Sequence, residues 1–514
     1  MSQETSTNNL RIAKNTFLLY VRMIVIMLVS LYTSRVVLSN LGVDDYGIYN
    51  VVGGVVAMFS FVNGAMKGVT QRYITFALGK GNQKQLSIAF NTSLQIHFLI
   101  ALLIFVLAET VGLWFLKTKM NIPESREVAA FVVYQCSILS TLVLIMSVPY
   151  NAIIVAHERM SAFAYISIVE VGLKLVIAFA LTIYTIDKLI FYAILLLIVQ
   201  VLIRVIYGRY CAIHFSETKI LKVKDRRLFR EMLSFAGWNM WGGLAVITYT
   251  QGLNIMLNLF FTPVVNAARA IAVQVQYAVQ QFSVNVQTAI NPQITKSYAQ
   301  GNFDYMHSLI FRSSKFTFIL LFIISLPLIL ETDYILLIWL KEVPEYTGIF
   351  LQIILCITII DAVSNPLMTG AQASGKIRLY QLVVGGIQLL ILPISYIVLK
   401  LGHPPYYVFI VHFSVSVAAY IIRIFIVKPL IKLSLREYLR KVIIPCVIIV
   451  LSAFPIPFFV KSKLVELSFV NFLVVCFVSV ICVSVSANFF GLNKSERLFI
   501  RTKLLSFIKK YNFT

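Results

Sequence analysis

Long apolar runs separated by short polar segments recur along the whole chain. A run of about 20 apolar residues is what one helix needs to cross the hydrocarbon core of a bilayer. The pattern predicts about fourteen such spans, at residues 17–38, 45–66, 87–116, 128–150, 161–184, 188–208, 234–260, 264–290, 307–331, 346–369, 377–400, 404–428, 439–461 and 467–490. We therefore expect an all-α polytopic membrane protein.

The composition agrees with a membrane protein throughout. Of the 514 residues, 59% are hydrophobic and 13% are charged, whereas about a quarter of an ordinary soluble protein is charged. The first apolar run is too long for a signal-peptide core, so we expect it to remain as a span. The six cysteines show no CxxC pair and no histidine partners at ligand spacing, which indicates neither a metal site nor a disulfide framework.

The net charge of +23 could suggest a nucleic-acid partner, but the positions of the basic residues argue against one. With the N-terminus inside, most of the 44 Lys and Arg fall on the cytoplasmic side. This asymmetry follows the positive-inside rule and predicts that both termini are cytoplasmic. The basic blocks at 204–230, 423–441 and 494–510 are then topology signals that also contact anionic membrane lipids.

The chain also contains an internal repeat. Residues 72–87 align without gaps with residues 292–307, and the matches are Ile74, Thr75, Gly81 and Asn82 with Ile294, Thr295, Gly301 and Asn302. A second match pairs Pro149, Ala156 and Arg159 with Pro366, Ala373 and Lys376. Each match alone is weak, but both fall in cytoplasmic loops or helix ends of equivalent spans. Together they favour a duplication of six spans with a pseudo-symmetry axis along the membrane normal.

The repeat predicts four regions along the chain. These are an N-terminal six-helix lobe at 1–208, a basic cytoplasmic linker at 209–233, a second six-helix lobe at 234–430, and two additional helices with a basic tail at 431–514. Two similar lobes around a central cavity are typical of alternating access. No nucleophile elbow, carboxylate pair or phosphate-binding glycine loop occurs at a usable spacing, so we expect neither enzyme activity nor a cofactor.

Cations inside the predicted spans are candidates for function, because a charge at the bilayer centre costs about 2.5 to 3.5 kcal/mol on insertion scales. They are Arg22, Arg35, Lys174 and Arg269. Arg22 and Arg35 are roughly 20 Å apart along one helix, so they cannot hold one phosphate together. Each either contacts substrate or extends towards the nearer membrane surface.

Carboxylates inside the spans are candidates for ion coupling. Glu170 stands four residues before Lys174, which is the favourable order for an intrahelical ion pair. This pair is either a self-neutralised unit that eases insertion or a proton or cation site. Asp361 is the other carboxylate well inside a span, and it is a second candidate unless it simply pairs with a basic residue at the cytoplasmic face.

The spans at 234–260 and 264–290 carry amide side chains at helical spacing. They include Gln251, Asn254, Asn258, Gln274, Gln281 and Asn285. Lipid cannot solvate such a strip, so it faces either protein or a wet cavity. Amides are suited to hydrogen-bonding sugars, whereas the alternative is polar contact between helices. The extent of the strip favours a substrate cavity.

The segment LGVDDYGIYNVVGGVVAMFSF at 41–61, followed by RYITFALGKGN at 72–82, resembles the start of known exporters. These are the polysaccharide exporters of the multidrug/oligosaccharidyl-lipid/polysaccharide (MOP) superfamily, whose fold is MATE-like. The branch it resembles is that of the O-antigen-type flippases. The number of spans, the repeat and the two extra helices extend the resemblance over nearly the whole chain.

The resemblance implies a flippase that moves undecaprenyl-pyrophosphate-linked oligosaccharide to the outer leaflet of the bacterial inner membrane, for surface polysaccharides such as lipopolysaccharide O-antigen. Cationic cavity residues would meet the pyrophosphate, and Arg22 and Arg269 lie in comparable helices. We further expect antiport with a proton or sodium ion, and polysaccharide polymerase machinery as a partner. The alternatives are a cation-coupled multidrug exporter, a peptidoglycan-precursor flippase or, in a different class, a membrane glycosyltransferase or polymerase.

Overall fold

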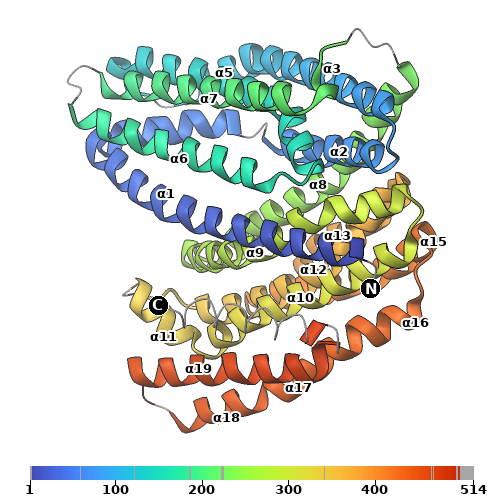
Figure 1. Cartoon of the computed structure of the whole chain (residues 1–514). Helices are drawn as coiled ribbons and strands as arrows, with labels where there is room; N and C mark the ends of the chain where they lie inside the picture. The colour runs from blue at the N-terminus through green and yellow to red at the C-terminus, as the bar shows by residue number, and fades with distance from the viewer. Residues whose placement is uncertain are drawn as a thin grey trace, which may run out of the picture. The chain divides into compact units, whose positions relative to one another are not determined.

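The computed structural model describes residues 3–57, 60–120, 122–183, 187–221, 225–340, 342–464, 466, 468–493 and 496–497. Within these residues the chain is helical and contains no β-strand (Figure 1). The all-α prediction is therefore confirmed. The chain divides into two compact units, which are described separately: unit 1 is Met1–Gly243 with Thr288–Asn302, and unit 2 is Leu244–Gln287 with Phe303–Thr514.

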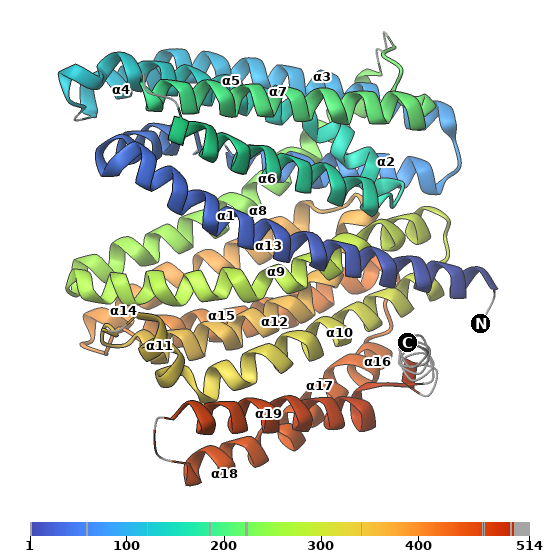
Figure 2. The same cartoon turned by 60° about the vertical axis from the view of Figure 1, so that its left-hand side comes forward.

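Unit 1 is built from the first seven α-helices and from parts of two more. The helices are α1 (Gln3–Ala57), α2 (Ser60–Gly79), α3 (Gln83–Leu107), α4 (Leu113–Lys119), α5 (Glu127–Ala156), α6 (Met160–Ile183) and α7 (Lys188–His214), with the first part of α8 (Arg226–Phe260) and the last part of α9 (Pro263–Ala299). Helix α5 packs against both α3 and α7 (Figures 1 and 2). Buried apolar side chains such as Ile153, Phe163 and Ile203 form a hydrophobic core of unit 1.

Unit 2 contains the remaining parts of α8 and α9 and all later helices. These are α10 (Phe303–Leu330), α11 (Thr332–Leu340), α12 (Thr347–Ser374), α13 (Arg378–Leu389), α14 (Ile391–Lys400), α15 (Tyr407–Ile431), α16 (Leu435–Tyr438), α17 (Ile444–Ala453), α18 (Pro455–Lys463) and α19 (Phe469–Ser486). Helix α12 packs against α10 and α15, and α19 packs against α17 and α18 (Figure 2).

Eleven helical segments of the described chain are long and apolar enough to cross a membrane. The other three predicted spans also fall on helices: 45–66 on the end of α1 and the start of α2, 234–260 on α8, and 264–290 on α9. These helices are more polar, so the count of fourteen stays a prediction. Large apolar side chains are exposed on the long helices, for example Phe17 (66%) and Phe477 (68%). Such a surface fits contact with lipid.

A glycine breaks α1 where the first predicted span ends. Gly42 has φ 77° and ψ 173°, a backbone conformation that is essentially restricted to glycine. A Cβ at this position would meet nothing within 4 Å, so the dihedral angles and not the available space require glycine. The Leu41-Gly42 motif thus has a structural reason, because it separates the first span from the helical segment that follows.

The two repeated segments contain the same backbone turn. Gly81 has φ 67° and Gly301 has φ 73°, which is the left-handed conformation favoured at helix C-termini. The structure corrects the prediction that residues 72–87 and 292–307 are loops, because 72–79 are helical in α2 and 292–299 are helical in α9. Buried Ile74 and Ile294 extend the apolar face of each helix into these polar-looking segments.

Residues assigned to the outer side of the membrane lie together in unit 1. Arg126 forms ion pairs with Asp45 and with Asp187, at 2.7 Å in the second case. Asp187 also caps α7, since its Oδ1 accepts hydrogen bonds from the backbone N–H groups of Leu189 and Ile190. The three charged residues come from three segments that the positive-inside pattern places on one side.

Candidate functional site

A buried carboxylate joins three segments of unit 1. The Glu158 side chain is 0% exposed and forms ion pairs with Arg11, at 2.8 Å from Nε, and with Lys296, at 2.5 Å from Nζ. The side-chain amide of Gln293 donates to both carboxylate oxygens at 2.9 and 2.8 Å. Asn15 donates to the backbone carbonyl of Glu158 at 3.2 Å. This Glu158 cluster ties the start of α1 and the end of α9 to the turn after α5.

The backbone of Glu158 is unusual for a glutamate. Its φ is 60°, and the equivalent position in the second half of the repeat is Gly375, with φ 78°. A non-glycine residue in the left-handed region costs of order 1 to 3 kcal/mol and persists where the surroundings fix it. The charge-assisted hydrogen bonds of the Glu158 cluster supply that constraint.

A second acid–base pair lies one residue earlier. His157 Nε2 is 2.6 Å from Glu217 Oε1, and the Gln83 side-chain amide donates to Glu217 Oε2 at 3.0 Å. Burial raises the pKa of Glu217, but the hydrogen bonds from His157, from its own backbone and from Gln83, with the attraction of His157, together outweigh it, so the pKa lies below its usual value. The start of the predicted cytoplasmic linker is therefore held against α3 and α5.

Arg22 lies on α1 and faces an aromatic ring of α6. Its guanidinium carbon is 4.6 Å from the ring centroid of Phe163, and the Lys67 Nζ of α2 is 5.8 Å from the same centroid. The buried Nε of Arg22 has no hydrogen-bond partner among the described residues. Two cations thus lie against the same aromatic ring, and cation–π attraction stabilises each of them there. Arg35, nearer the end of the first span, is exposed.

The intrahelical pair predicted on α6 is present. Lys174 Nζ is 2.7 Å from Glu170 Oε1, and both side chains are partly exposed. Glu170 also interacts electrostatically with Arg22. Glu170 is therefore near enough to Arg22 to feel its charge, and the role of the pair in ion coupling stays a prediction.

Arg269 connects the two polar helices within unit 2. Its Nη2 donates to the Thr250 carbonyl at 2.7 Å, and its Nη1 donates to Asn254 Oδ1 at 3.4 Å. The buried Nε of Arg269 has no hydrogen-bond partner within the described part of the chain. The structure thus brings the predicted residues Arg269 and Asn254 together.

The amide strip on α8 and α9 is mostly exposed. Gln251, Asn258, Gln274 and Gln281 are exposed, Asn254 is half-buried and Asn285 is buried. Tyr277, on the same strip, is 61% exposed. Hydrocarbon does not solvate exposed amides, so water or a polar ligand must cover this surface. Asn285 differs from the others, because it is buried and already interacts with other parts of the protein.

Asp361 of α12 has a cationic neighbour that sequence reasoning assigned to a cytoplasmic basic block. It interacts electrostatically with Arg423 of α15, and Arg423 Nη1 donates a hydrogen bond to the Ser364 hydroxyl. The guanidinium carbon of Arg423 is 5.7 Å from the ring centroid of Tyr380. Asp361 and Arg423 therefore form a polar cluster inside unit 2.

Family comparison identifies the chain. Residues 12–298 match the family described as "Polysaccharide biosynthesis protein", which is more than half of the sequence. The chain belongs to the polysaccharide biosynthesis protein family. No curated protein sequence matches it.

Solved structures of MOP superfamily transporters share the fold of this polysaccharide biosynthesis protein. An outward-facing multidrug resistance MATE transporter is 13% identical, with a TM-score of 0.71 over 82% of this chain and 95% of that one. A MATE protein in a bent conformation is 13% identical, with a TM-score of 0.70 over 83% of this chain and 96% of that one. A MOP superfamily transporter from Pyrococcus furiosus is 15% identical, with a TM-score of 0.66 over 82% of this chain and 95% of that one. The fold is MATE-like, and its long apolar helices indicate a multi-pass membrane protein.

Sequence reasoning missed three residues of this polysaccharide biosynthesis protein. Lys67 stands just beyond the predicted span 45–66, and Arg423 was counted with a basic block. Glu158 lies between two predicted spans, where charged residues are common. Its alignment with Gly375 in the repeat was the available signal, because a charged residue at a glycine position needs a local reason.

Proposed function

We propose that this protein is a transporter that flips an undecaprenyl-pyrophosphate-linked oligosaccharide from the cytoplasmic to the outer leaflet of the bacterial inner membrane by alternating access. Both termini would face the cytoplasm. The observation that carries the proposal is the exposed amide strip of α8 and α9 beside Arg269. Amides match the hydroxyl groups of sugars, and a guanidinium matches phosphate oxygens in a forked geometry.

The cations of unit 1 support a second phosphate contact. Arg22 and Lys67 lie over the same ring of Phe163, so an anion placed there would meet two positive charges. A pyrophosphate carries more negative charge than a single phosphodiester and would gain correspondingly from paired cations. The lipid tail would remain in the bilayer against the exposed apolar helices.

A multidrug exporter is the second candidate, and the polarity of α8 and α9 argues against it. Pockets for drug-sized molecules are lined mainly by apolar and aromatic side chains, whereas Gln251, Gln274 and Gln281 are exposed amides. Complementation separates the two functions. Expression in a strain without its oligosaccharide flippase should restore surface glycan, and expression in a drug-sensitive strain should leave drug tolerance unchanged.

The opposite pattern in these strains would contradict the proposal. A third strain, depleted of its peptidoglycan-precursor flippase, covers the remaining transporter of this class. Rescue of that strain alone would assign the chain to cell-wall precursor transport. Glycan display that requires a glycosyltransferase donor but no preformed lipid-linked oligosaccharide would indicate an enzyme.

We further propose that Asp361 couples transport to a proton or sodium gradient. Its neighbour Arg423 would hold the carboxylate charged until an ion or proton replaces that interaction. Asp361→Asn should make flipping in membrane vesicles independent of the gradient and about tenfold slower. The matched control is Glu466→Gln, at an exposed carboxylate between α18 and α19. If Asp361→Asn keeps the gradient dependence of flipping and Glu170→Gln loses it, the coupling residue is Glu170 of α6 and not Asp361.

A further inference from the structure

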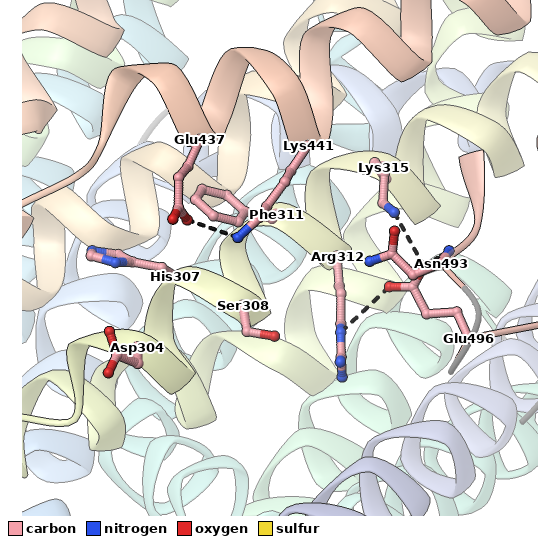
Figure 3. A pocket seen from close by; sticks show the side chains of 10 residues that line it. All are labelled: Asp304, His307, Ser308, Phe311, Arg312, Lys315, Glu437, Lys441, Asn493 and Glu496. Carbon is pink, nitrogen blue, oxygen red and sulfur yellow. Dashed lines mark hydrogen bonds and ion pairs between the residues drawn. The ribbon is translucent and has the colours of Figure 1, made fainter. Parts of the chain in front are cut away.

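A polar cavity of about 270 Å³ lies at the start of α10, and we call it the α10 pocket. Three segments of unit 2 line it, as Figure 3 shows: α10, the α16–α17 junction and the chain after α19. Its side chains are Asp304, His307, Ser308, Phe311, Arg312, Lys315, Glu437, Lys441, Asn493 and Glu496. The positive-inside pattern puts all three segments at the cytoplasmic membrane surface. The pocket is therefore at the level of lipid headgroups.

Charges follow the same order along two walls of the pocket. On α10, Asp304 lies in the first turn and Arg312 follows eight residues later, roughly 12 Å deeper along the helix. On the other wall, Glu437 precedes Lys441 by one turn. Both helices start in the cytoplasm and run towards the membrane. Each wall therefore has its carboxylate nearer to water and its cation nearer to hydrocarbon.

The cations retain capacity for a ligand. Arg312 directs its Nε at Glu496 over 3.4 Å, and its terminal nitrogens have no ion pair among the described residues. Lys441 pairs with Glu437 at 2.8 Å, but both side chains are about half exposed, so the pair is weak and exchangeable. Lys315 differs, because Glu496 and the Gly491 carbonyl already hold it at 3.1 and 2.6 Å.

The carboxylates also retain capacity for a ligand. Asp304 is exposed and forms no ion pair within the described part of the chain. Ser308 lies one turn from both Asp304 and Arg312 on the same face of α10, as its place in Figure 3 shows. The wall thus offers an acceptor, a hydroxyl and a guanidinium in sequence.

We propose that the α10 pocket binds the phosphoethanolamine headgroup of a membrane lipid. The phosphate would contact Arg312, Lys441 and Ser308, and the ammonium group would contact Asp304 and Glu437. A zwitterionic lipid has its phosphate nearer the glycerol and its amine nearer water, which is the charge order of both walls. An anionic headgroup would leave the carboxylates unpaired, and a quaternary amine could not donate hydrogen bonds to them.

Native mass spectrometry of the full chain with phosphatidylethanolamine, phosphatidylglycerol and phosphatidylcholine of equal acyl length tests this proposal. The chain should retain phosphatidylethanolamine about tenfold better than either other lipid. Water-soluble glycerophosphoethanolamine should bind much more weakly. If it binds as tightly as the lipid, the lipid is not the ligand.

Variants of Asp304 sharpen the test. Asp304 forms no ion pair among the described residues, so we expect its substitution to leave folding unchanged. Asp304→Asn should remove the tenfold preference, and Asp304→Lys should reverse it towards phosphatidylglycerol. Arg227→Gln is the control, since Arg227 is 91% exposed and lies in the predicted cytoplasmic linker, and it should keep the wild-type preference. Equal binding of the three lipids by the wild-type chain, or an unchanged preference in Asp304→Lys, would overturn the proposal.

Discussion

Arg269→Ala should reduce flipping of lipid-linked oligosaccharide by about a hundredfold without lowering the amount of protein in the membrane. Arg269 is a half-buried cation that binds α8 through the Thr250 carbonyl and Asn254, and its Nε is still unpaired among the described residues. Loss of one charged hydrogen-bonded contact to a substrate typically costs 2 to 5 kcal/mol, and about a hundredfold is the lower part of that range. Surface glycan display in the complemented strain measures the effect.

Arg22→Ala should act in the same way from unit 1, because its guanidinium shares the Phe163 ring with Lys67. Arg227→Ala serves as the control for loss of an exposed cation. Arg269→Lys should retain part of the activity, since lysine keeps the positive charge but cannot form two parallel hydrogen bonds to a phosphate. Normal glycan display by Arg269→Ala, at normal protein level, would remove this residue from the substrate path.

Glu158→Gln should lower the free energy of unfolding by about 3 to 5 kcal/mol, because it leaves a buried cation without its counter-ion. Lys296 is the affected cation, since its side chain is 17% exposed, whereas Arg11 is 45% exposed and can turn to water. Thermal unfolding of the purified chain measures the loss.

A double-mutant cycle shows whether the loss comes from this ion pair. Lys296→Met combined with Glu158→Gln should be less destabilising than the sum of the two single changes. Additive losses would mean that Glu158 and Lys296 stabilise the chain independently. If Glu158→Gln lowers the free energy of unfolding by less than about 1 kcal/mol, the pair contributes no more than an ordinary surface ion pair.

Apolar patterning predicted most helices because a span is a local property of about 20 consecutive residues. The ends of helices were harder to predict. Arg72 in α2 carries a charge where the sequence suggested a loop, but its guanidinium carbon lies 4.4 Å from the Tyr73 ring centroid and 5.5 Å from that of Phe235. Aromatic contact from another helix shelters the charge, and such contact is not visible in a sequence window.

The candidate sites divide in the same way. The pair of Glu170 and Lys174 was predictable because the two residues are one helical turn apart. The Glu158 cluster was not, since Glu158 and Lys296 are separated by 138 residues. The amide strip on α8 and α9 was predicted from helical spacing, whereas its exposure and the link between Arg269 and Thr250 needed the packing of two helices.

Flipping by the purified chain in liposomes tests the proposed function most directly. The substrate is a fluorescent undecaprenyl-pyrophosphate oligosaccharide present in both leaflets, and a glycan-cleaving enzyme added outside reports its accessibility. With the wild-type chain and an imposed ion gradient, we predict that substrate from the inner leaflet also becomes accessible, whereas liposomes with Arg269→Ala keep it protected. Substrate that stays protected with the wild-type chain, under proton and sodium gradients of either direction, would contradict the account.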